Sequence, residues 1–247
     1  TEDHSLLSDK REKIKPGECV VGETKLFQCF PNELSGEPIH LNEIVEELDM
    51  YENSIKTIEE KEAFIYGVFF GDGSCGCYDT KWGLKYSWAI NNQNKKLLEQ
   101  CKLYLEELYD ENTNFKILNT LKSSNVDKLV PYGSIKYMVD LFRTLFYDKD
   151  KYKIVPNKIL NGSYEVRKNF FLGYYAADGY KCRNVKAKNI CFSNKGKIGS
   201  SQLYYLCKTL GYNVSINTRN DKLNIYKITC SLTKLRKPAN ILKKMIY

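Results

Sequence analysis

The spacing of apolar residues predicts two helices that share one sequence pattern. Residues 64–73 read FIYGVFFGDG and residues 170–179 read FFLGYYAADG, and they align position for position at an offset of 106 (178 − 72). Each copy is followed by the same order of elements. These are extended sequence with alternating polar residues, a periodic helix and further strand-like sequence. They include 84–91, 95–109 and 114–123 after the first copy and 186–194, 201–212 and 212–231 after the second. A helix-strand-strand-helix-strand-strand unit therefore occurs twice, as in a pseudo-dimer.

The first part of the chain has a different pattern. Residues 1–40 alternate in short stretches such as ECVVGETKLFQCF, interrupted by proline and glycine, and this predicts small strands and turns. Residues 41–62 are acidic and partly amphipathic, which predicts a helix with a break near Asn53. A chain of 247 residues suits one large domain or two small ones. We expect a small domain with its linker at 1–50 and a larger one at 51–247, with halves at 60–160 and 165–247.

Small residues share one face of each repeated helix. Gly67 and Gly71 are four residues apart, as are Gly173 and Ala177. A glycine inside a helix costs about 1 kcal/mol relative to alanine. Small residues at this spacing allow two helices to approach more closely than usual. The pattern predicts that the two helices pack directly against each other.

An aspartate closes each repeated helix, Asp72 in the first and Asp178 in the second. The glycine after each aspartate predicts a left-handed turn at the helix end. A carboxylate at the negative end of the helix dipole is unfavourable, and a second carboxylate nearby increases the repulsion. A hard divalent cation with oxygen ligands, Mg²⁺ above all, would supply the counter-charge. We therefore expect Asp72 and Asp178 to be metal ligands, the alternative being two unrelated helix-ending turns.

Charge is distributed unevenly along the chain. The net charge is +8, but residues 1–62 hold 16 acidic and 7 basic residues, leaving 14 acidic and 31 basic residues in 63–247, a net +17. A basic region rich in Tyr and Phe fits a surface that neutralises phosphates, and a solvated lysine coat is the alternative. Candidate DNA contacts on the strand-like segments are Lys81, Lys85, Lys116, Lys122, Lys186, Lys188, Arg219 and Lys222.

Other classes of protein are disfavoured. His4 and His40 are the only histidines, so the basic region cannot hold a histidine-based nuclease or triad. Residues 71–76, GDGSCG, fit a G-x-G-x-x-G pattern, but a helix precedes them where a dinucleotide site needs a strand. Nine irregularly spaced cysteines favour a reduced, intracellular protein over a disulfide scaffold. The sequence has neither a membrane span nor a secretory signal.

The two motifs, FIYGVFFGDG and FFLGYYAADG, resemble the paired motifs of the LAGLIDADG (DOD-type) homing endonucleases, over residues 55–247. The resemblance implies an α+β fold with two pseudo-symmetric αββαββ halves, whose sheets bind the major groove of DNA. It also implies catalytic, metal-binding roles for Asp72 and Asp178. Lys153 resembles the basic residue near a scissile phosphate, and Lys234 is the choice for the second half, with Lys227 and Lys237 as rivals. Asn91 and Asn194 could orient water or serve in turns.

The N-terminal TEDHS resembles the Thr-x-x-His block of inteins, with Thr1 and His4 in the matching positions, and KPGECVVGETKL is similar to inteins of family B DNA polymerases. That resemblance implies a β-rich splicing-domain remnant at 1–50. The sequence lacks an upstream nucleophile segment and a terminal His-Asn, so we expect an intein fragment that does not splice as given, from a parent chain capable of protein splicing.

Together these features predict a monomeric, Mg²⁺-dependent, site-specific double-strand DNA endonuclease encoded within an intein. It would hydrolyse phosphodiester bonds, bind double-stranded DNA and no membrane, and act inside the cell wherever the host polymerase gene resides. One alternative is an inactive DNA- or RNA-binding protein on the same fold, similar to a maturase. Another is an acid-triad nuclease of the RNase H type, which the glycine-spaced helix argues against.

Overall fold

The computed structural model describes residues 5–10, 12–20, 22–26, 55–109, 113–120, 124–133, 135–181, 189–219 and 221–231. The chain divides into two compact units, residues 1–34 and 35–247. The domain boundary predicted after residue 50 lies outside the described residues, as does most of the helix predicted at 41–62. None of the described helices is long and apolar enough to cross a bilayer.

The first unit contains short β elements. Strand β1 (Leu6–Leu7) pairs antiparallel with β2 (Lys13–Ile14), and a 3₁₀ turn, η1, covers Pro16–Glu18. An isolated bridge joins Ser8 to Leu26. Small strands were predicted here, but within ECVVGETKLFQCF the described residues form turns and this single bridge.

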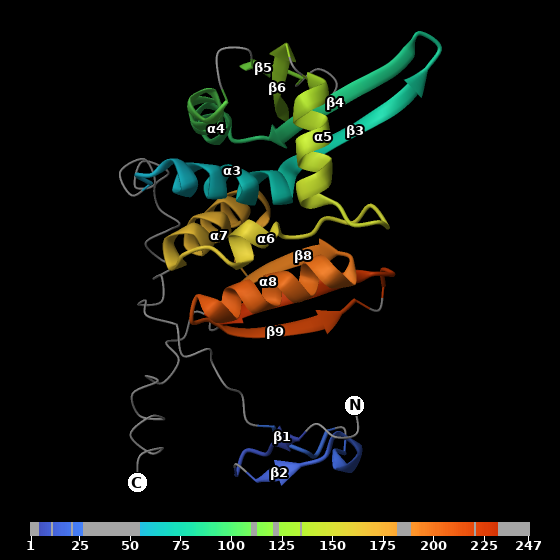
Figure 1. Cartoon of the computed structure of the whole chain (residues 1–247), viewed down its shortest axis with the longest axis vertical. Helices are drawn as coiled ribbons and strands as arrows, with labels where there is room; N and C mark the ends of the chain where they lie inside the picture. The colour runs from blue at the N-terminus through green and yellow to red at the C-terminus, as the bar shows by residue number, and fades with distance from the viewer. Residues whose placement is uncertain are drawn as a thin grey trace. The chain divides into compact units, whose positions relative to one another are not determined.

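The second unit consists of two halves with the same topology (Figure 1). The first half contains α3 (Ile58–Asp72), β3 (Gly73–Thr80), β4 (Gly83–Asn92), α4 (Lys95–Leu108), β5 (Thr113–Leu118), β6 (Asp127–Gly133) and α5 (Ile135–Phe146). The second half contains α6 (Asn157–Leu160), α7 (Tyr164–Asp178), β7 (Tyr180–Lys181), β8 (Asn189–Lys195), α8 (Lys197–Thr209), β9 (Asn213–Thr218) and β10 (Ile225–Ser231). Their antiparallel sheets have the equivalent orders β3-β4-β6-β5 and β7-β8-β10-β9. The predicted pair of αββαββ halves is confirmed.

Hydroxyl caps begin both motif helices. The Thr57 hydroxyl accepts a hydrogen bond from the Glu60 amide at 3.2 Å, and the Ser163 hydroxyl accepts one from the Val166 amide at 3.3 Å. Each cap satisfies one of the backbone donors that the first turn of a helix leaves free. The caps set the start of α3 at Ile58, several residues before the repeated motif.

Helix α5 was not among the elements that the sequence predicted. Its apolar face covers the first sheet and completes an aromatic cluster. The Phe142 ring centroid lies 4.5 Å from that of Phe69 and 5.2 Å from that of Trp88, and Phe146 stacks on Phe142 at 5.5 Å. The first half therefore has an additional helical layer that fixes α3 against its sheet.

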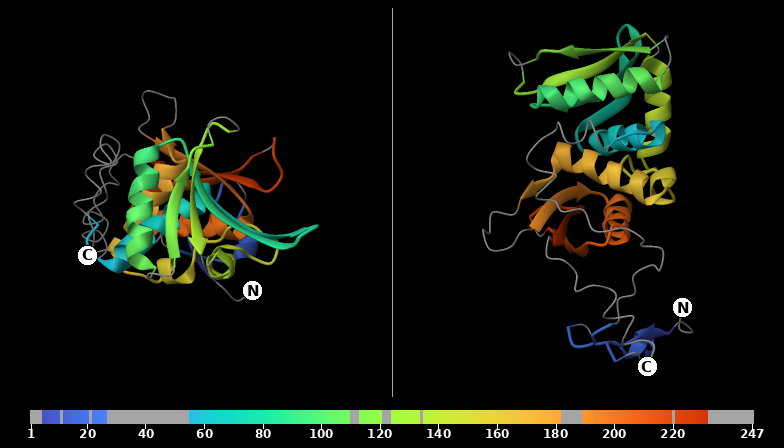
Figure 2. Two further views of the ribbon diagram at one scale, coloured as in Figure 1. Left: turned by 90° about the horizontal axis from the view of Figure 1, so that it is seen from above. Right: turned by 90° about the vertical axis from the view of Figure 1, so that its left-hand side faces the viewer.

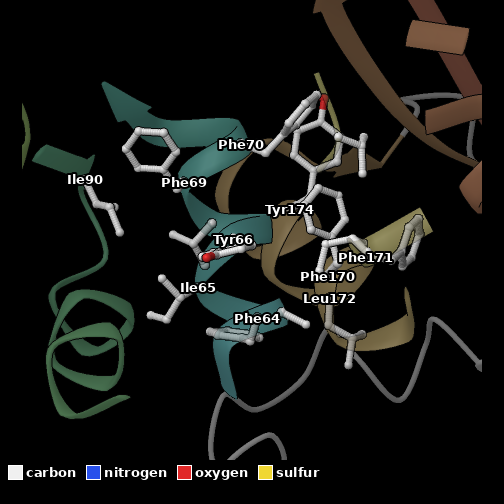
Figure 3. Close-up of a cluster of buried hydrophobic side chains, with 14 of the residues drawn as sticks. Phe64, Ile65, Tyr66, Phe69, Phe70, Ile90, Phe170, Phe171, Leu172 and Tyr174 are labelled. Carbon is white, nitrogen blue, oxygen red and sulfur yellow. The ribbon is translucent and has the colours of Figure 1, made fainter. Parts of the chain in front are cut away.

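The two motif helices lie side by side between the two sheets (Figures 1 and 2). A Cβ atom placed on Gly67 would lie 2.0 Å from the backbone oxygen of Phe170, and one on Gly173 would lie 2.1 Å from that of Phe64. The two backbones are therefore in direct contact, as the small-residue spacing predicted. Aromatic rings flank this seam (Figure 3), with Phe70 packed edge-on against Tyr174 at 5.1 Å.

The glycines that end the motif helices do not adopt the predicted left-handed turn. Gly73 has φ −78° and ψ 151°, and Gly179 has φ −75° and ψ 139°, so both are extended. The helix therefore passes directly into the following strand. Glycine is required here by space, because an added Cβ would lie 2.2 Å from the ring of Phe69 at Gly73 and 2.2 Å from the ring of Tyr175 at Gly179.

Six of the described cysteines are free, namely Cys19, Cys75, Cys77, Cys101, Cys207 and Cys230. Cys191, in β8, is disulfide-bonded, so the expectation of a reduced protein is wrong at this residue.

Candidate catalytic centre and nucleic-acid interface

The two aspartates predicted to be catalytic lie at adjacent helix ends. Gly67 faces Phe170 and Tyr174, while Gly71, one turn later, faces Ala177 and Asp178, so α3 and α7 run in the same direction. An added Cβ on Gly71 would lie 3.2 Å from the Cβ of Asp178. Asp72 follows Gly71 directly, and the two carboxylates are close enough for the charge of Asp178 to raise the pKa of Asp72.

Partial removal from water raises the pKa of both carboxyls. Desolvation raises the pKa of Asp72 from 3.8 to about 6. A hydrogen bond from Asn92 and the charge of Lys153 lower this pKa, and the charge of Asp178 raises it. Desolvation likewise raises the pKa of Asp178, although its side chain is more exposed, and Lys153 opposes the shift. This acidic pair is therefore electrostatically unfavourable without an added positive charge.

Lys153 caps the C-terminal end of α3. Its Nζ lies within hydrogen-bond distance of the carbonyl oxygens of Phe69 at 2.8 Å, Phe70 at 3.0 Å, Gly71 at 3.3 Å and Gly73 at 2.6 Å, which share its three N–H donors. The carbonyls of Phe70 and Gly71 lie in the last turn of α3, where no later residue of the helix can donate to them, so the ammonium also offsets the negative end of the dipole. Burial lowers the pKa of Lys153 to about 8, while the charges of Asp72, Cys75 and Asp178 raise it.

The family resemblance predicted that Lys153 is a basic residue near a scissile phosphate, and the fold places it within electrostatic reach of both aspartates. Its ammonium, however, is held by backbone oxygens. Lys234 and its rival Lys237 lie outside the described residues. The other rival, Lys227, lies in β10 opposite Ser193 and Asn217.

Asn92 is a residue of this centre that the sequence analysis missed. Its Nδ2 donates to Oδ2 of Asp72 at 2.5 Å, and its Oδ1 accepts from the amide of Asn94 at 2.6 Å, which fixes the orientation of the side-chain amide. The neighbouring Asn91 donates to the backbone oxygen of Asp72 at 3.3 Å. Only the pairing of β3 with β4, which sets Gly73 opposite Ile90, brings these asparagines to the helix end.

The second half lacks this contact. In its sheet Tyr180 pairs with Cys191, so Asn194 holds the position in β8 that Asn92 holds in β4. The Nδ2 of Asn194 instead donates to the Ser200 hydroxyl at 3.0 Å and to the Lys195 oxygen at 3.3 Å. Among the described residues, an asparagine therefore orients the carboxylate of Asp72 but not that of Asp178.

The donor set of the centre fits a hard cation. Carboxylate oxygens are the ligands that Mg²⁺ and similar ions prefer. Over the ranges that the structure describes, no group of three or more His, Cys, Asp or Glu side chains could hold a metal ion. The aspartate pair would therefore need additional oxygen ligands from backbone, water or phosphate.

The outer face of each sheet, defined as the face opposite the packed core, carries no acidic residue in its described strands. In the first sheet Trp88 packs on the core, and the residues alternating with it face outward. The outward positions are Ser74, Gly76, Tyr78, Thr80, Lys85, Ser87, Ala89, Asn91, Asn114, Lys116, Leu118, Lys128, Val130 and Tyr132. In the second sheet they are Asn189, Cys191, Ser193, Lys195, Asn213, Ser215, Asn217, Ile225, Lys227, Thr229 and Ser231.

Lysine, hydroxyl and amide groups on these faces match the groups that contact phosphates and base edges. Of the predicted DNA contacts, Lys85 and Lys116 lie exposed on the first outer face, and Lys81 lies in the β3–β4 turn. Arg219 is bound by Asp221, at 2.9 Å between its Nε and Oδ1, and Lys222 is exposed. Lys122, Lys186 and Lys188 fall outside the described residues.

Comparisons with known proteins agree with this architecture. Residues 165–242 match the family model of the LAGLIDADG-like domain. A DNA polymerase of Acanthamoeba polyphaga mimivirus is 48% identical over 245 residues, covering 99% of this chain, and the chain spans 13% of that polymerase. The structure of I-DmoI in complex with DNA and Mn has 17% identity and a TM-score of 0.54, covering 76% of this chain and 96% of that one. A variant of I-DmoI, in complex with its target DNA in the presence of Mg, has 18% identity and a TM-score of 0.52, covering 71% of this chain and 90% of that one.

Proposed function

We propose that this chain cleaves both strands of double-stranded DNA at a specific site. The match to the LAGLIDADG-like domain model and the homing-endonuclease fold support this proposal. The observation that carries this proposal is the convergence of Asp72 and Asp178 at the ends of two parallel helices in backbone contact. Since one chain supplies both carboxylates, a monomer would suffice. The acid-free outer faces of the sheets provide the surface for the duplex.

Asp72 and Asp178 would hold a divalent cation, with Mg²⁺ as the proposed ion. When bound, such a cation supplies positive charge at the phosphate and a more acidic water. The proposal is supported by the unfavourable charge of the acidic pair and by the Mn and Mg named with the matched I-DmoI structures. Asn92 orients the Asp72 carboxylate, and Lys153 fixes the end of α3 while favouring the ionised form of both acids.

The polymerase relative supports a location within an intein. The chain matches 13% of that relative's length at 48% identity, as an inserted segment of a host polymerase would. Thr1 and His4, the predicted splicing residues, lie outside the described residues. We propose that the parent chain splices this segment out and that the endonuclease acts inside the cell, where the host gene resides.

The test is cleavage of a plasmid that carries the presumed host polymerase gene without the insert. The expected result is a single double-strand break with Mg²⁺ and none with a chelator. Asp72→Asn and Asp178→Asn should each abolish the double-strand break, while a mobility-shift assay with Ca²⁺ shows near-normal binding. If either Asn variant makes the break at the normal rate, the assigned roles are wrong. Binding by the unaltered chain without cleavage in Mg²⁺ or Mn²⁺ would favour the alternative, an inactive DNA- or RNA-binding protein on this fold.

A further inference from the structure

Two buried cysteines of the second half meet where α8 covers its sheet (Figure 1). Cys207 lies on the buried face of α8 with Leu203 and Leu206, at the spacing of one helix face. Cys230 lies in β10 and alternates with the buried Ile228, so both point to the same face of the sheet. Because α8 packs on β10, both thiols enter one interface.

The two thiols contact each other and lie near α7. Both cysteines are free of disulfide bonds. A hydrogen bond between the thiols of Cys207 and Cys230, together with burial, raises the pKa of Cys207 well above its usual value. Burial also raises the pKa of Tyr174, and the charges of Asp178 and of both thiols raise it further. The thiol pair therefore lies beneath α7, the helix that ends at Asp178.

The first half shows that the fold does not require this pair. The offset of 106 that relates the two motifs also relates Cys207 to Cys101 (207 − 101) in α4, and Cys101 is buried and free as well. The strand equivalent to β10 is β6, DKLVPYG, which contains no cysteine. A single buried cysteine packs as a small apolar residue, whereas two in contact can also react with each other. The second half therefore has a reactive pair where the first half has one thiol.

We propose that Cys207 and Cys230 form a disulfide when the folded chain meets a small-molecule disulfide, and that this bond fixes α8 to the sheet of the second half. The thiolate of one cysteine attacks the small disulfide, which gives a mixed disulfide and releases one small thiol. The other cysteine then attacks the protein sulfur of the mixed disulfide and releases the second small thiol. Both cysteines are oxidised, the small disulfide is reduced, and the two cysteine protons leave on the two small thiols. This inference does not depend on the proposed DNA cleavage.

Burial limits the rate of this reaction, and the bond limits local opening. Because both cysteines are buried, a reagent reaches them only when α8 separates locally from β10. The disulfide joins residues 23 positions apart (230 − 207) and encloses β9, so it opposes the same separation. Cys191, in the neighbouring strand β8, is already disulfide-bonded, so oxidised cysteine is part of this half.

Peptide mapping tests the bond. The full chain is incubated with oxidised glutathione for times on the order of hours, in urea concentrations from zero to just below the unfolding midpoint, and is then blocked with iodoacetamide and digested with trypsin. The peptides 198–208 and 228–234, which contain Cys207 and Cys230, should appear joined, faster as urea increases local opening, and dithiothreitol should separate them. Cys101→Ala, the matched control, should give the same joined peptides. Recovery of the two peptides unjoined at every urea concentration below the midpoint would overturn the inference.

Thermal unfolding provides the second measurement. Oxidation should raise the unfolding temperature of the unaltered chain by about 5 °C or more, the shift expected from closing a loop of this length in a chain of this size. Cys101→Ala should show the same shift and Cys230→Ala should show none. If Cys230→Ala folds poorly, Cys207→Ala removes the other sulfur and takes its place. An unfolding temperature that stays the same or falls in the joined protein would overturn the inference, because the bond would then not fix α8 to the sheet.

Discussion

Replacing Gly67 by alanine should destabilise the protein, although alanine is the better helix former. Gly67 lies in the middle of α3, and an added Cβ would lie 2.0 Å from the Phe170 oxygen and 2.7 Å from the Tyr174 nitrogen. Both neighbours are backbone atoms of α7, so no side-chain rotation can relieve the overlap. The two helices must move apart.

The size of the effect follows from these distances. Ordinary contact begins near 3.4 Å, so the helices would separate by up to 1.4 Å (3.4 − 2.0) along that contact. Overpacking of a core costs about 1–3 kcal/mol, and more when backbone must move. Alanine recovers about 0.5–1 kcal/mol of helix propensity. We expect a net loss of about 2 kcal/mol or more in the free energy of unfolding.

Gly71→Ala is the matched control. Its Cβ would lie 2.8 Å from the Cβ of Ala177, a shortfall of 0.6 Å (3.4 − 2.8) against a side-chain atom near the helix end. Its counterpart in α7 is already alanine. The Cβ of Ala177 is fixed to its backbone, so the helices must also move, but by less than half as far, and this variant should lose less stability than Gly67→Ala.

Urea unfolding followed by circular dichroism measures both variants, and comparison of the denaturation midpoints at a common slope gives the difference in free energy of unfolding. Gly67→Ala should also lose double-strand cleavage, because the separation moves Asp72 away from Asp178. A Gly67→Ala protein as stable as Gly71→Ala would refute the reasoning, since helix propensity would then outweigh contact at the seam.

Two further predictions follow from the charges. Asn92→Ala removes a hydrogen bond that lowers the pKa of Asp72, so this pKa should rise above about 6. The acidic limb of the pH–cleavage profile should then move to higher pH, with cleavage recovering at alkaline pH. Asn194→Ala should leave the limb in place, and an unmoved limb for Asn92→Ala would exclude the orienting role of Asn92. DNA affinity should fall steeply as the salt concentration rises. Replacing Lys85 and Lys116 by alanine should lower the slope of log affinity against log salt by about 0.9 for each phosphate that is no longer neutralised, whereas Lys102→Ala on α4 should leave the slope unchanged. A flat salt dependence of the unaltered chain would argue against a phosphate-binding face.

Some parts of this protein could be predicted because their signals are local and repeated. Two aligned helices with glycine or alanine four residues apart predicted the seam, and the sequence following each predicted the sheets. The resemblance of both motifs to one family then gave Asp72 and Asp178 their proposed roles. Helix α5 is amphipathic, but it was not predicted, because it lies outside the segments that repeat in the sequence.

Other features depend on contacts between distant parts of the chain. Asn92 reaches Asp72 only through the register of β4 on β3, and Lys153 reaches the end of α3 from more than 80 residues away. A sequence does not record which carbonyl or carboxylate will accept a given donor. The glycines after the aspartates show the same limit. Glycine suits both a left-handed turn and a position crowded by an aromatic ring. In the structure both glycines are extended and lie against the rings of Phe69 and Tyr175.

The sequence by itself therefore determined the repeated elements, the small residues that let α3 and α7 touch, and the two acids that end them. Tertiary structure decided how each acid is held: Asp72 by Asn92, and Asp178 without the equivalent bond because Asn194 binds Ser200. The physical reason is how far apart in the sequence the interacting residues lie. Periodicity and residue size act between neighbours on one helix or strand, whereas hydrogen bonding and desolvation depend on which groups the folded chain brings within a few ångströms.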